Sequence, residues 1–245
     1  DISMEHVDFS YDSKPILKNV SLAIPDKTTT AIVGPSGSGK TTLCNLIARF
    51  WDVDHGSIRI GDADVREYTL ESLMNQISMV FQKVYLFADT IENNIKFGRP
   101  DATHEQVVEA ARKACCHDFI EALPDGYNTV IGEGGATLSG GEKQRISIAR
   151  AILKDSPIII FDEATANVDP ENEDKLQKAM EELMRDKTII MIAHRLKTVQ
   201  KADQILVLDD GAIVQRGTHA QLSEKPGLYR DFLNARKEAA GWKLS

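Results

Sequence analysis

Hydrophobic and polar positions alternate in the first part of the chain. Residues 7–9 and 20–24 follow this alternation, and residues 28–33 form a β-branched, apolar run. A period of two predicts strands with one buried face. Short strands also follow at 58–60 and around Val65, on either side of a Gly-Asp turn. We therefore expect an antiparallel β subdomain at the N-terminus.

Further along, helical and strand patterns take turns. Residues 107, 108, 111 and 114 are apolar at helical spacing, and an apolar strand is expected at 77–81. After Ser139, the pattern predicts elements in this order: a helix to about 154, a strand at 157–161, a helix at 170–184, and strands at 189–193 and 205–208. Short apolar strands between helices indicate a parallel sheet covered on both faces.

The fold class expected is therefore α/β, a mostly parallel sheet covered by helices, with the β subdomain at its N-terminal side. We expect residues 1–83 and 155–245 to form this core. Residues 84–154 are expected to form an α-helical subdomain inserted into it.

Composition narrows the class of protein. The chain has 245 residues, 42% hydrophobic and 27% charged, which is typical of a globular protein with a sizeable core. Its net charge of −8 argues against extended wrapping by nucleic acid. The three cysteines are Cys44, Cys115 and Cys116, an odd number that favours a reducing compartment over a disulfide framework. The chain does not begin with Met, so we expect a domain of a longer polypeptide.

A glycine-rich octapeptide lies between the expected strand at 28–33 and a helix expected from Lys40 to Phe50. It matches the pattern G-x-x-x-x-G-K-[ST], whose backbone N–H groups surround phosphates at a helix N-terminus. Lys40 can reach the β- and γ-phosphates, and the Thr41 hydroxyl can ligate Mg²⁺. A plain glycine-rich turn is the alternative, but the flanking strand and helix favour nucleotide binding. The candidate binding residues are Gly34, Pro35, Ser36, Gly37, Ser38, Gly39, Lys40, Thr41 and Thr42.

An apolar strand ends in two adjacent carboxylates, Asp162 and Glu163. Ligands of open α/β sheets bind beyond the carboxyl ends of the strands. Asp162 is therefore expected to hold the Mg²⁺ of a nucleotide, and Glu163 to accept a proton from an attacking water. Acidic residues after a strand are usually loop residues or caps, but beside a phosphate loop they favour hydrolysis.

A second glycine pair opens a later helix. Ser139 and Glu142 have the spacing of a capping box. This explains neither Gly140 nor Gly141, because each glycine costs about 1 kcal/mol relative to alanine in a helix. Glycines there allow an anion to approach the helix N–H groups closely. The phosphate loop already accounts for one triphosphate, so this second anion site is expected to serve a nucleotide on another subunit.

These motifs resemble those of the nucleotide-binding domain of ABC transporters, over nearly the whole chain. Residues 34–41 resemble the family's Walker A motif, and residues 161–163 its Walker B motif with the catalytic glutamate. Residues 138–142 read LSGGE, similar to the LSGGQ signature, which in the family closes on the γ-phosphate bound to the partner domain. The resemblance implies an ATPase that uses ATP and Mg²⁺ and dimerises head to tail.

Other positions acquire a role only from the resemblance. Gln82 fits the Q-loop glutamine, which senses Mg²⁺ and the attacking water, and His194 fits the switch histidine at the γ-phosphate. Tyr11 fits the aromatic residue that stacks on adenine, and residues 166–169 occupy the D-loop. Taken singly, Tyr11 would be a half-buried strand-end aromatic and His194 a structural histidine. Their joint occurrence in the right order favours the functional interpretation.

Two segments point to the exporter type within the family. Residues 86–95 and 130–135 resemble exporter segments that face the cytoplasmic coupling helices of the membrane domain. The resemblance implies two partners, a transmembrane domain and a second nucleotide-binding domain, at the cytoplasmic face of the cell membrane. Glu142 and Asn167 depart from the commoner Gln and Ser of the family.

Other classes of ATPase fit the sequence less well. A soluble ABC-type ATPase acting on DNA or ribosomes normally has a coiled-coil insertion or a second ATPase domain. Here about a hundred residues separate Lys40 from Ser139 without a heptad run. A small-molecule P-loop kinase has no use for LSGGE or for Glu163, and no nucleic-acid partner is expected. The expected catalytic residues are Glu163, His194, Gln82 and Lys40, and the expected metal ligands are Thr41, Gln82 and Asp162.

Overall fold

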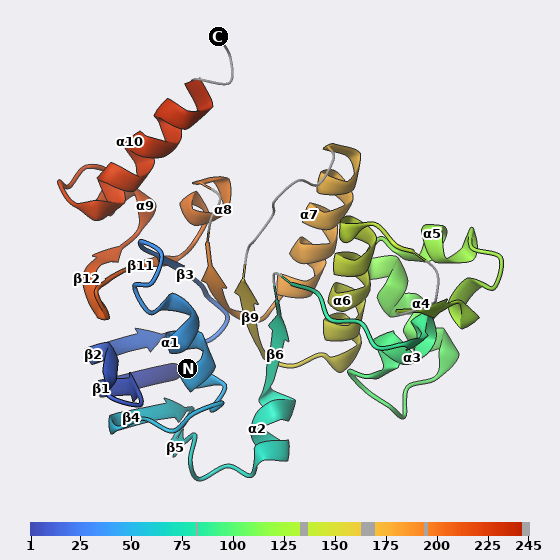
Figure 1. Cartoon of the computed structure of the whole chain (residues 1–245), viewed down its shortest axis with the longest axis horizontal. Coiled ribbons are helices and arrows are strands. Elements are labelled where there is room, and N and C mark those ends of the chain that lie inside the picture. The colour runs from blue at the N-terminus through green and yellow to red at the C-terminus, as the bar shows by residue number, and fades with distance from the viewer. Residues whose placement is uncertain (82, 133–136, 163–169, 194–195, 242–245) are drawn as a thin grey trace. The chain divides into compact units, whose positions relative to one another are not determined.

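A computed structural model describes residues 1–81, 83–132, 137–162, 170–193 and 196–241 (Figure 1). The chain divides into two compact units. Unit 1 comprises Asp1–Met74, Ile160–Ala164 and Thr188–Ser245, and unit 2 comprises Asn75–Ile159 and Thr165–Lys187. Unit 2 includes the whole of the expected helical subdomain, 84–154, together with flanking segments.

The N-terminal sheet of unit 1 is antiparallel, as predicted. Its strands are β1 (Ile2–Tyr11), β2 (Lys14–Ile24), β4 (His55–Ile60) and β5 (Ala63–Asp64), in the order β2-β1-β4-β5. Ile2 pairs with Ile24 on β2 and with Ile60 on β4. Ile2 and Met4 are buried on alternate positions of β1, so the period of two marks the face that packs into the core.

The second sheet of unit 1 is mostly parallel. Its strands follow the order β12-β11-β3-β10-β9. They are β12 (Ala212–Gly217), β11 (Gln204–Asp209), β3 (Thr29–Val33), β10 (Thr188–Ile192) and β9 (Ile158–Asp162). Of β9, the residues from Ile160 on belong to unit 1. β3 runs parallel to both β10 and β11, and β12 is antiparallel to β11. Residues 30–33 of β3 are all buried, as expected of a strand covered on both faces.

Along the chain, the helices of unit 1 lie between or after its strands (Figure 1). They are α1 (Lys40–Ile47), α8 (Leu196–Gln200), α9 (His219–Ser223) and α10 (Leu228–Gly241), and α2 (Leu70–Gln76) begins in this unit. β12 and the helices α2, α8, α9 and α10 were not predicted from the sequence.

The expected helix from Lys40 to Phe50 is too long, because α1 ends at Ile47. Arg49 adopts a left-handed backbone conformation with φ of 55°. The N–H of Phe50 donates to the carbonyl of Asn45 at 2.9 Å, and the N–H of Arg49 donates to that of Leu46 at 3.0 Å. These are the two hydrogen bonds of a Schellman motif, whose left-handed position is usually glycine. An arginine there gave no sequence signal for the end of the helix.

Unit 2 is built around one long helix. α6 (Gly140–Lys154) contacts α3 (Ile91–Lys96), α4 (His104–Lys113) and α7 (Pro170–Met184) (Figure 1). The remaining elements are α5 (His117–Glu121), the 3₁₀ turn Gly126–Asn128, and the strands β6 (Ile77–Val80), β7 (Asp89–Thr90) and β8 (Val130–Ile131). Ile146, Ile148 and Ala149 of α6 are completely buried. Burial of this face stabilises the unit.

A polar network fastens the segment before α3 to α6. The side chain of Asn94 is fully buried; its Nδ2 donates to the carbonyls of Phe87 at 3.0 Å and Thr90 at 2.9 Å. Arg150 on α6 donates from Nε to the Asn94 carbonyl at 2.7 Å and from a terminal nitrogen to the Tyr85 carbonyl at 3.2 Å. Because Asn94 and Arg150 satisfy several backbone carbonyls at once, residues 85–90 are held to both helices.

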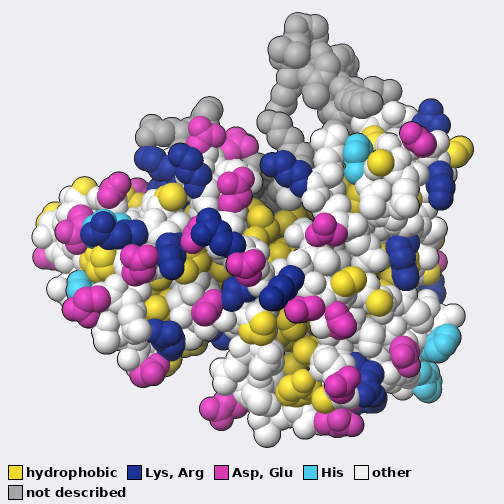
Figure 2. Space-filling model, turned by 180° about the vertical axis from the view of Figure 1, so that it is seen from behind, with side chains coloured by type: hydrophobic (Ala, Val, Ile, Leu, Met, Phe, Trp, Pro, Cys, Tyr) yellow, Lys and Arg dark blue, Asp and Glu magenta, His cyan; other side chains and the backbone are white. Residues whose placement is uncertain are grey.

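Two surface properties bear on partners. Within the described part of the chain, no helix combines the length and the apolar character needed to span a bilayer. Figure 2 shows acidic and basic side chains interspersed over the face that it displays. Mixed signs of this kind favour a solvated surface over an extended nucleic-acid groove.

Candidate functional site

The phosphate loop, residues 34–39, joins β3 to α1 in the predicted way. Gly34 has φ of 156° and Gly39 has φ of 103°, both outside the range that other residues adopt readily. A Cβ on Gly34 would lie 2.0 Å from the carbonyl oxygen of Leu208, and one on Gly39 would lie 2.8 Å from Leu17 Cδ2. The path of the loop through unit 1 therefore requires glycine at both positions.

The N-terminus of α1 has no side-chain cap among the described residues, since its N-cap is Gly39. Its first turn also carries no acidic side chain. The N–H groups at a helix start have no partner within the helix, and the helix dipole places partial positive charge there. The start of α1 is therefore suited to an anion such as a phosphate.

The remaining residues of the motif differ in exposure. Ser38 and Thr42 are buried, and the backbone carbonyl of Ser38 accepts a hydrogen bond from the N–H of Gly211 at 3.1 Å. Pro35, Ser36, Gly37 and Thr41 are exposed. The buried residues hold the loop in place, and the exposed ones are accessible to a ligand.

Lys40 and Asp162, far apart in sequence, come together in unit 1. Lys40 Nζ donates to the carbonyls of Gly34 at 2.9 Å and Pro35 at 2.7 Å. Burial lowers the pKa of Lys40, and the negative charge of Asp162 opposes this shift. Burial, and then the charge of Asp162, raise the pKa of the Cys44 thiol to about 12. Asp162 is thus close enough to influence both groups, as the sequence motifs predict.

A magnesium ion fits this donor set. The Asp162 carboxylate and the Thr41 hydroxyl supply the hard oxygen atoms that Mg²⁺ prefers. Among the described residues, no three His, Cys, Asp or Glu side chains gather into a metal cage.

Tyr11, the predicted adenine-stacking residue, belongs to an aromatic cluster on unit 1. Its ring centre lies 5.5 Å from that of Trp51 and 4.9 Å from that of Phe9, edge to face in both pairs. Trp51 is 53% exposed. Trp51 was not predicted from the sequence, because nothing local in the sequence signals a contact across forty residues.

At the second glycine-rich turn, residues 138–142, the predicted capping box is present. Ser139 Oγ accepts from the N–H of Glu142 at 3.2 Å, and Glu142 Oε2 accepts from the N–H of Ser139 at 2.7 Å. Apart from its chain neighbours and its own helix backbone, no described atom lies within 4 Å of a Cβ built on Gly140. By contrast, a Cβ on Gly98 in the same unit would lie 2.4 Å from the Arg150 carbonyl oxygen. Packing among the described residues of unit 2 therefore does not require glycine at position 140.

Several predicted residues lie outside the described part of the chain. They are Gln82, Glu163, His194 and the D-loop residues 166–169.

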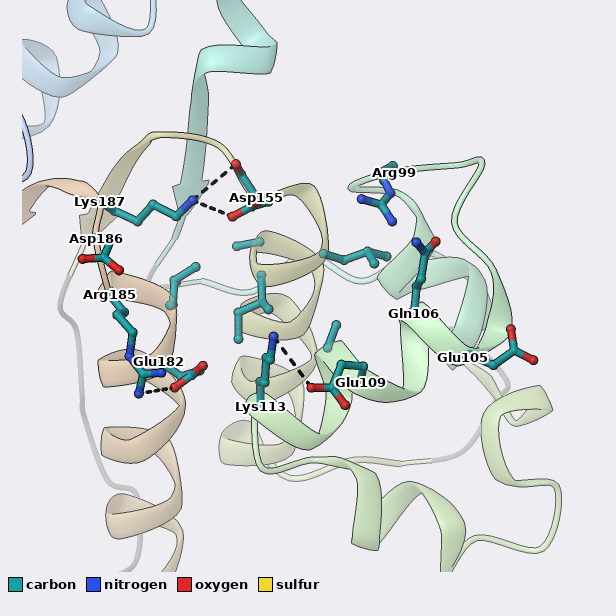
Figure 3. Close-up of a pocket in the computed structure, with 15 residues that line it drawn as sticks. Arg99, Glu105, Gln106, Glu109, Lys113, Asp155, Glu182, Arg185, Asp186 and Lys187 are labelled. Carbon is teal, nitrogen blue, oxygen red and sulfur yellow. Dashed lines mark hydrogen bonds and ion pairs between the residues drawn. The ribbon is translucent and has the colours of Figure 1, made fainter.

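A cavity of about 540 Å³ in unit 2 lies between α4 and the C-terminal ends of α6 and α7 (Figure 3). Charged side chains line much of it, and three ion pairs cross or border it: Lys187–Asp155 at 2.5 Å, Arg185–Glu182 at 2.8 Å and Lys113–Glu109 at 3.7 Å. None of the predicted site residues line it. Because the opposite charges in and around the cavity form ion pairs with one another, we interpret it as a solvent-filled space between helices and not as a ligand site.

Comparisons with known proteins agree with the motifs. The family described as ABC transporter matches residues 17–166. The ATP-dependent lipid A-core flippases of Escherichia coli (strain K12) and Shigella flexneri are each 51% identical over 232 residues, which is 94% of this chain and 40% of theirs. A solved bacterial Atm1-family ABC exporter with ATP bound is 42% identical, with a TM-score of 0.89 over 96% of this chain and 41% of that one.

The chain thus spans about 40% of the length of these relatives. The family match at 17–166 includes both the phosphate loop and the glycine-rich turn at 138–142. This chain belongs to the ABC transporter family, as an exporter-type nucleotide-binding domain.

Proposed function

We propose that this chain is the ATP-hydrolysing domain of an ABC exporter and that it works as a head-to-tail pair. Each ATP would lie between the phosphate loop of one domain and Ser139, Gly140 and Gly141 of the other. The observation that carries the proposal is the open space around Gly140. A glycine that its own fold does not require leaves room for a ligand or a partner.

The nucleotide end of this proposal rests on unit 1. The uncapped start of α1 and the Lys40 ammonium would bind the phosphates, and Tyr11 would stack on the adenine. Thr41, Asp162 and Gln82 would hold Mg²⁺, which when bound offsets negative charge on the β- and γ-phosphates. The Lys40 ammonium would exchange its bonds to the Gly34 and Pro35 carbonyls for phosphate oxygens.

Hydrolysis needs a base and a stabiliser of developing charge. We assign Glu163 as the group that accepts a proton from the attacking water. His194 and Lys40 would stabilise charge on the γ-phosphate, and Gln82 would report occupancy of the site to the membrane domain. The roles of Glu163, His194 and Gln82 rest on the family motifs.

A transmembrane domain, in the same polypeptide, is the second proposed partner, which places this domain at the cytoplasmic face of a membrane. The relatives named above are a flippase and an exporter, and the chain spans only part of them. Residues 84–154 would form the signature subdomain that contacts the coupling helices. In unit 2, Tyr85 is 69% and Phe97 is 62% exposed, which is the kind of aromatic surface that protein interfaces use. Neither relative supports the alternative of an ATPase acting on DNA or ribosomes.

The head-to-tail pairing can be tested by light scattering after size exclusion. Glu163→Gln should bind ATP without hydrolysing it, so ATP–Mg²⁺ should convert this variant from monomer to dimer. The parent chain should hydrolyse ATP and stay mostly monomeric, and Lys40→Ala should lose tight ATP binding and stay monomeric. A Glu163→Gln variant that binds ATP and remains a monomer would argue against pairing of the isolated domain.

A second variant tests the role of the glycine-rich turn. Gly140→Asp places a negative charge where the γ-phosphate of the partner's ATP would lie. It should leave ATP binding intact and abolish turnover. Turnover equal to that of the parent chain would remove the composite site from the proposal.

A further inference from the structure

A cavity of about 270 Å³ in unit 1 lies against the phosphate loop, under the start of α10. Of the eight residues that line it, seven are apolar or glycine and the eighth is Asp231. Apolar cavities of about 150 Å³ hold benzene in other proteins. This cavity therefore has room for a larger aromatic group of two fused rings.

The walls of the cavity come from the sheet and from α10. Val33 at the end of β3 and Val207 on β11 are 2% and 1% exposed, so the sheet side is a fixed apolar surface. On the α10 side, Phe232 adds an aromatic ring beside Leu228 and Ala235. Aromatic rings pack favourably against such a ring, edge to face or offset.

Asp231 gives the cavity its charge. A carboxylate in the first turn of a helix is favourable for the helix dipole, which alone would account for an acidic residue there. However, Asp231 also lines the cavity at its exposed edge, and among the described residues its carboxylate makes no ion pair or hydrogen bond with a side chain, so it is accessible to a cation in the cavity. A carboxylate at the edge of an apolar cavity favours a ligand that joins an apolar body to a cation.

We propose that this cavity is a binding site for a small arylalkyl ammonium. The aromatic rings would lie between Val33, Val207 and Phe232, and the ammonium would pair with Asp231. This site shares Gly34 and Pro35 with the proposed ATP site, but the amine would lie among Val33, Val207 and α10, and its binding there does not require that the chain hydrolyse ATP.

Binding there would be linked to the nucleotide site through the phosphate loop. Gly34 and Pro35 line the cavity, and their carbonyl oxygens accept the hydrogen bonds of Lys40 Nζ. A ligand in the cavity therefore contacts the two residues that position the Lys40 ammonium. If the amine changes the affinity for ATP by some factor, ATP must change the affinity for the amine by the same factor.

The charge preference can be measured by titration calorimetry on the 245-residue chain, with tryptamine, indole and indole-3-acetate as probes. Tryptamine should saturate one site with a Kd of about 1 mM, given its size. Indole should bind about fivefold more weakly, because it lacks the ion pair, and indole-3-acetate should bind most weakly. Asp231→Asn should reduce tryptamine binding to that of indole. Glu224→Gln, an exposed carboxylate after α9 that does not line the cavity, should change nothing.

Cavity occupancy can be tested with a matched pair on α10. Ala235→Phe fills the cavity and should abolish tryptamine binding. Asn234→Phe adds the same ring at a neighbouring position that does not line the cavity, and it should bind tryptamine like the parent chain. ATP binding, measured on every variant, shows that the fold of unit 1 is intact and separates failure here from failure of the proposed ATPase.

Three results would overturn the proposal. The first is the absence of saturable tryptamine binding by a chain that binds ATP. The second is equal affinity for tryptamine and indole that Asp231→Asn does not alter. The third is a set of two observations: ATP displaces tryptamine fully, and Tyr11→Ala abolishes tryptamine binding whereas Ala235→Phe does not. The amine would then occupy the position of the adenine. An ATP affinity that saturating tryptamine leaves unchanged would overturn the link to the phosphate loop.

Discussion

The phosphate loop of unit 1 and the glycine-rich turn of unit 2 both place glycines at the start of a helix, but for different reasons. At Gly34, an added Cβ would lie 2.0 Å from the Leu208 carbonyl oxygen, whereas at Gly140 it would meet no described atom within 4 Å. Contacts among the described residues thus require the first glycine and leave the second unexplained. A glycine with no internal reason is the stronger indication of something outside the chain.

The helix starts differ in the same sense. α1 begins after Gly39 without a side-chain cap among the described residues, whereas Ser139 and Glu142 form both hydrogen bonds of a capping box at the start of α6. The N–H groups of α1 are therefore available to a ligand. At α6 the cap satisfies part of the helix start, and the exposed surface is that of Gly140.

The largest expected effect is a loss of stability at Gly34. Gly34→Ala should lower the free energy of unfolding by about 3 kcal/mol in urea denaturation, because its methyl group overlaps the Leu208 carbonyl. Gly37→Ala is the matched control, with φ of 78° but open space around its Cβ. It should cost only about 1 kcal/mol, from backbone strain. Equal losses for the two variants would contradict the steric argument.

Gly140→Ala should show the opposite profile. Its unfolding free energy should stay the same or rise by up to about 1 kcal/mol, since alanine is the better helix residue. ATP turnover should fall about tenfold, which corresponds to a loss of about 1.4 kcal/mol of transition-state stabilisation. Gly98→Ala in the same unit, crowded by the Arg150 carbonyl, should instead lower stability. Full turnover by Gly140→Ala would break the comparison.

The capping box allows stability and activity to be separated. Ser139→Ala should lower the unfolding free energy by about 1 kcal/mol, through loss of the cap. Thr103→Ala removes an equivalent capping box from α4, away from the proposed site, and should cost a similar amount. Only Ser139→Ala should also slow turnover, which a steady-state ATPase assay checks. Equal turnover in the two variants would leave Ser139 with a capping role alone.

The mildest test changes no residue. Burial raises the pKa of both Cys44 and Cys116 to about 12, so at pH 8 both remain thiols and react slowly with iodoacetamide. Cys115 is half-buried and should account for about one reactive thiol per chain. Raising the pH towards 12 should increase the thiolate fraction of the other two.

In mild denaturant, alkylation followed by mass spectrometry then compares the two units. Cys44 reports opening of unit 1 around the phosphate loop, and Cys116 reports opening of unit 2. ATP–Mg²⁺ should slow alkylation of Cys44 more than that of Cys116. Fast alkylation of Cys44 in the native chain would contradict its burial.

Local patterns predicted much of this structure. The strand, loop and helix around Lys40, the parallel sheet and the capping box at Ser139 follow from periods and spacings within a few residues. β12 was missed although its signal exists: Asp210 and Gly211 have φ of 43° and 79°, as in the tight hairpin turns that Asp-Gly pairs favour.

Other features arise only from packing between distant segments. The pairing of Tyr11 with Trp51 and the cavity between Val33 and α10 join residues that no sequence period relates. The left-handed Arg49 that ends α1 belongs to the same class, because its residue type does not favour that conformation. For Gln82, Glu163 and His194 the sequence motifs remain the basis of the assignment.

The geometry of α6 has a mechanical consequence for unit 2. Its fifteen residues form a rod about 22 Å long, with Ser139 at one end and Arg150 near the other. Arg150 donates hydrogen bonds to the carbonyls of Asn94 and Tyr85, and the helix between Arg150 and the capped turn is continuous. A displacement of residues 85–90 should therefore shift the whole of α6, and Ser139 should move together with it.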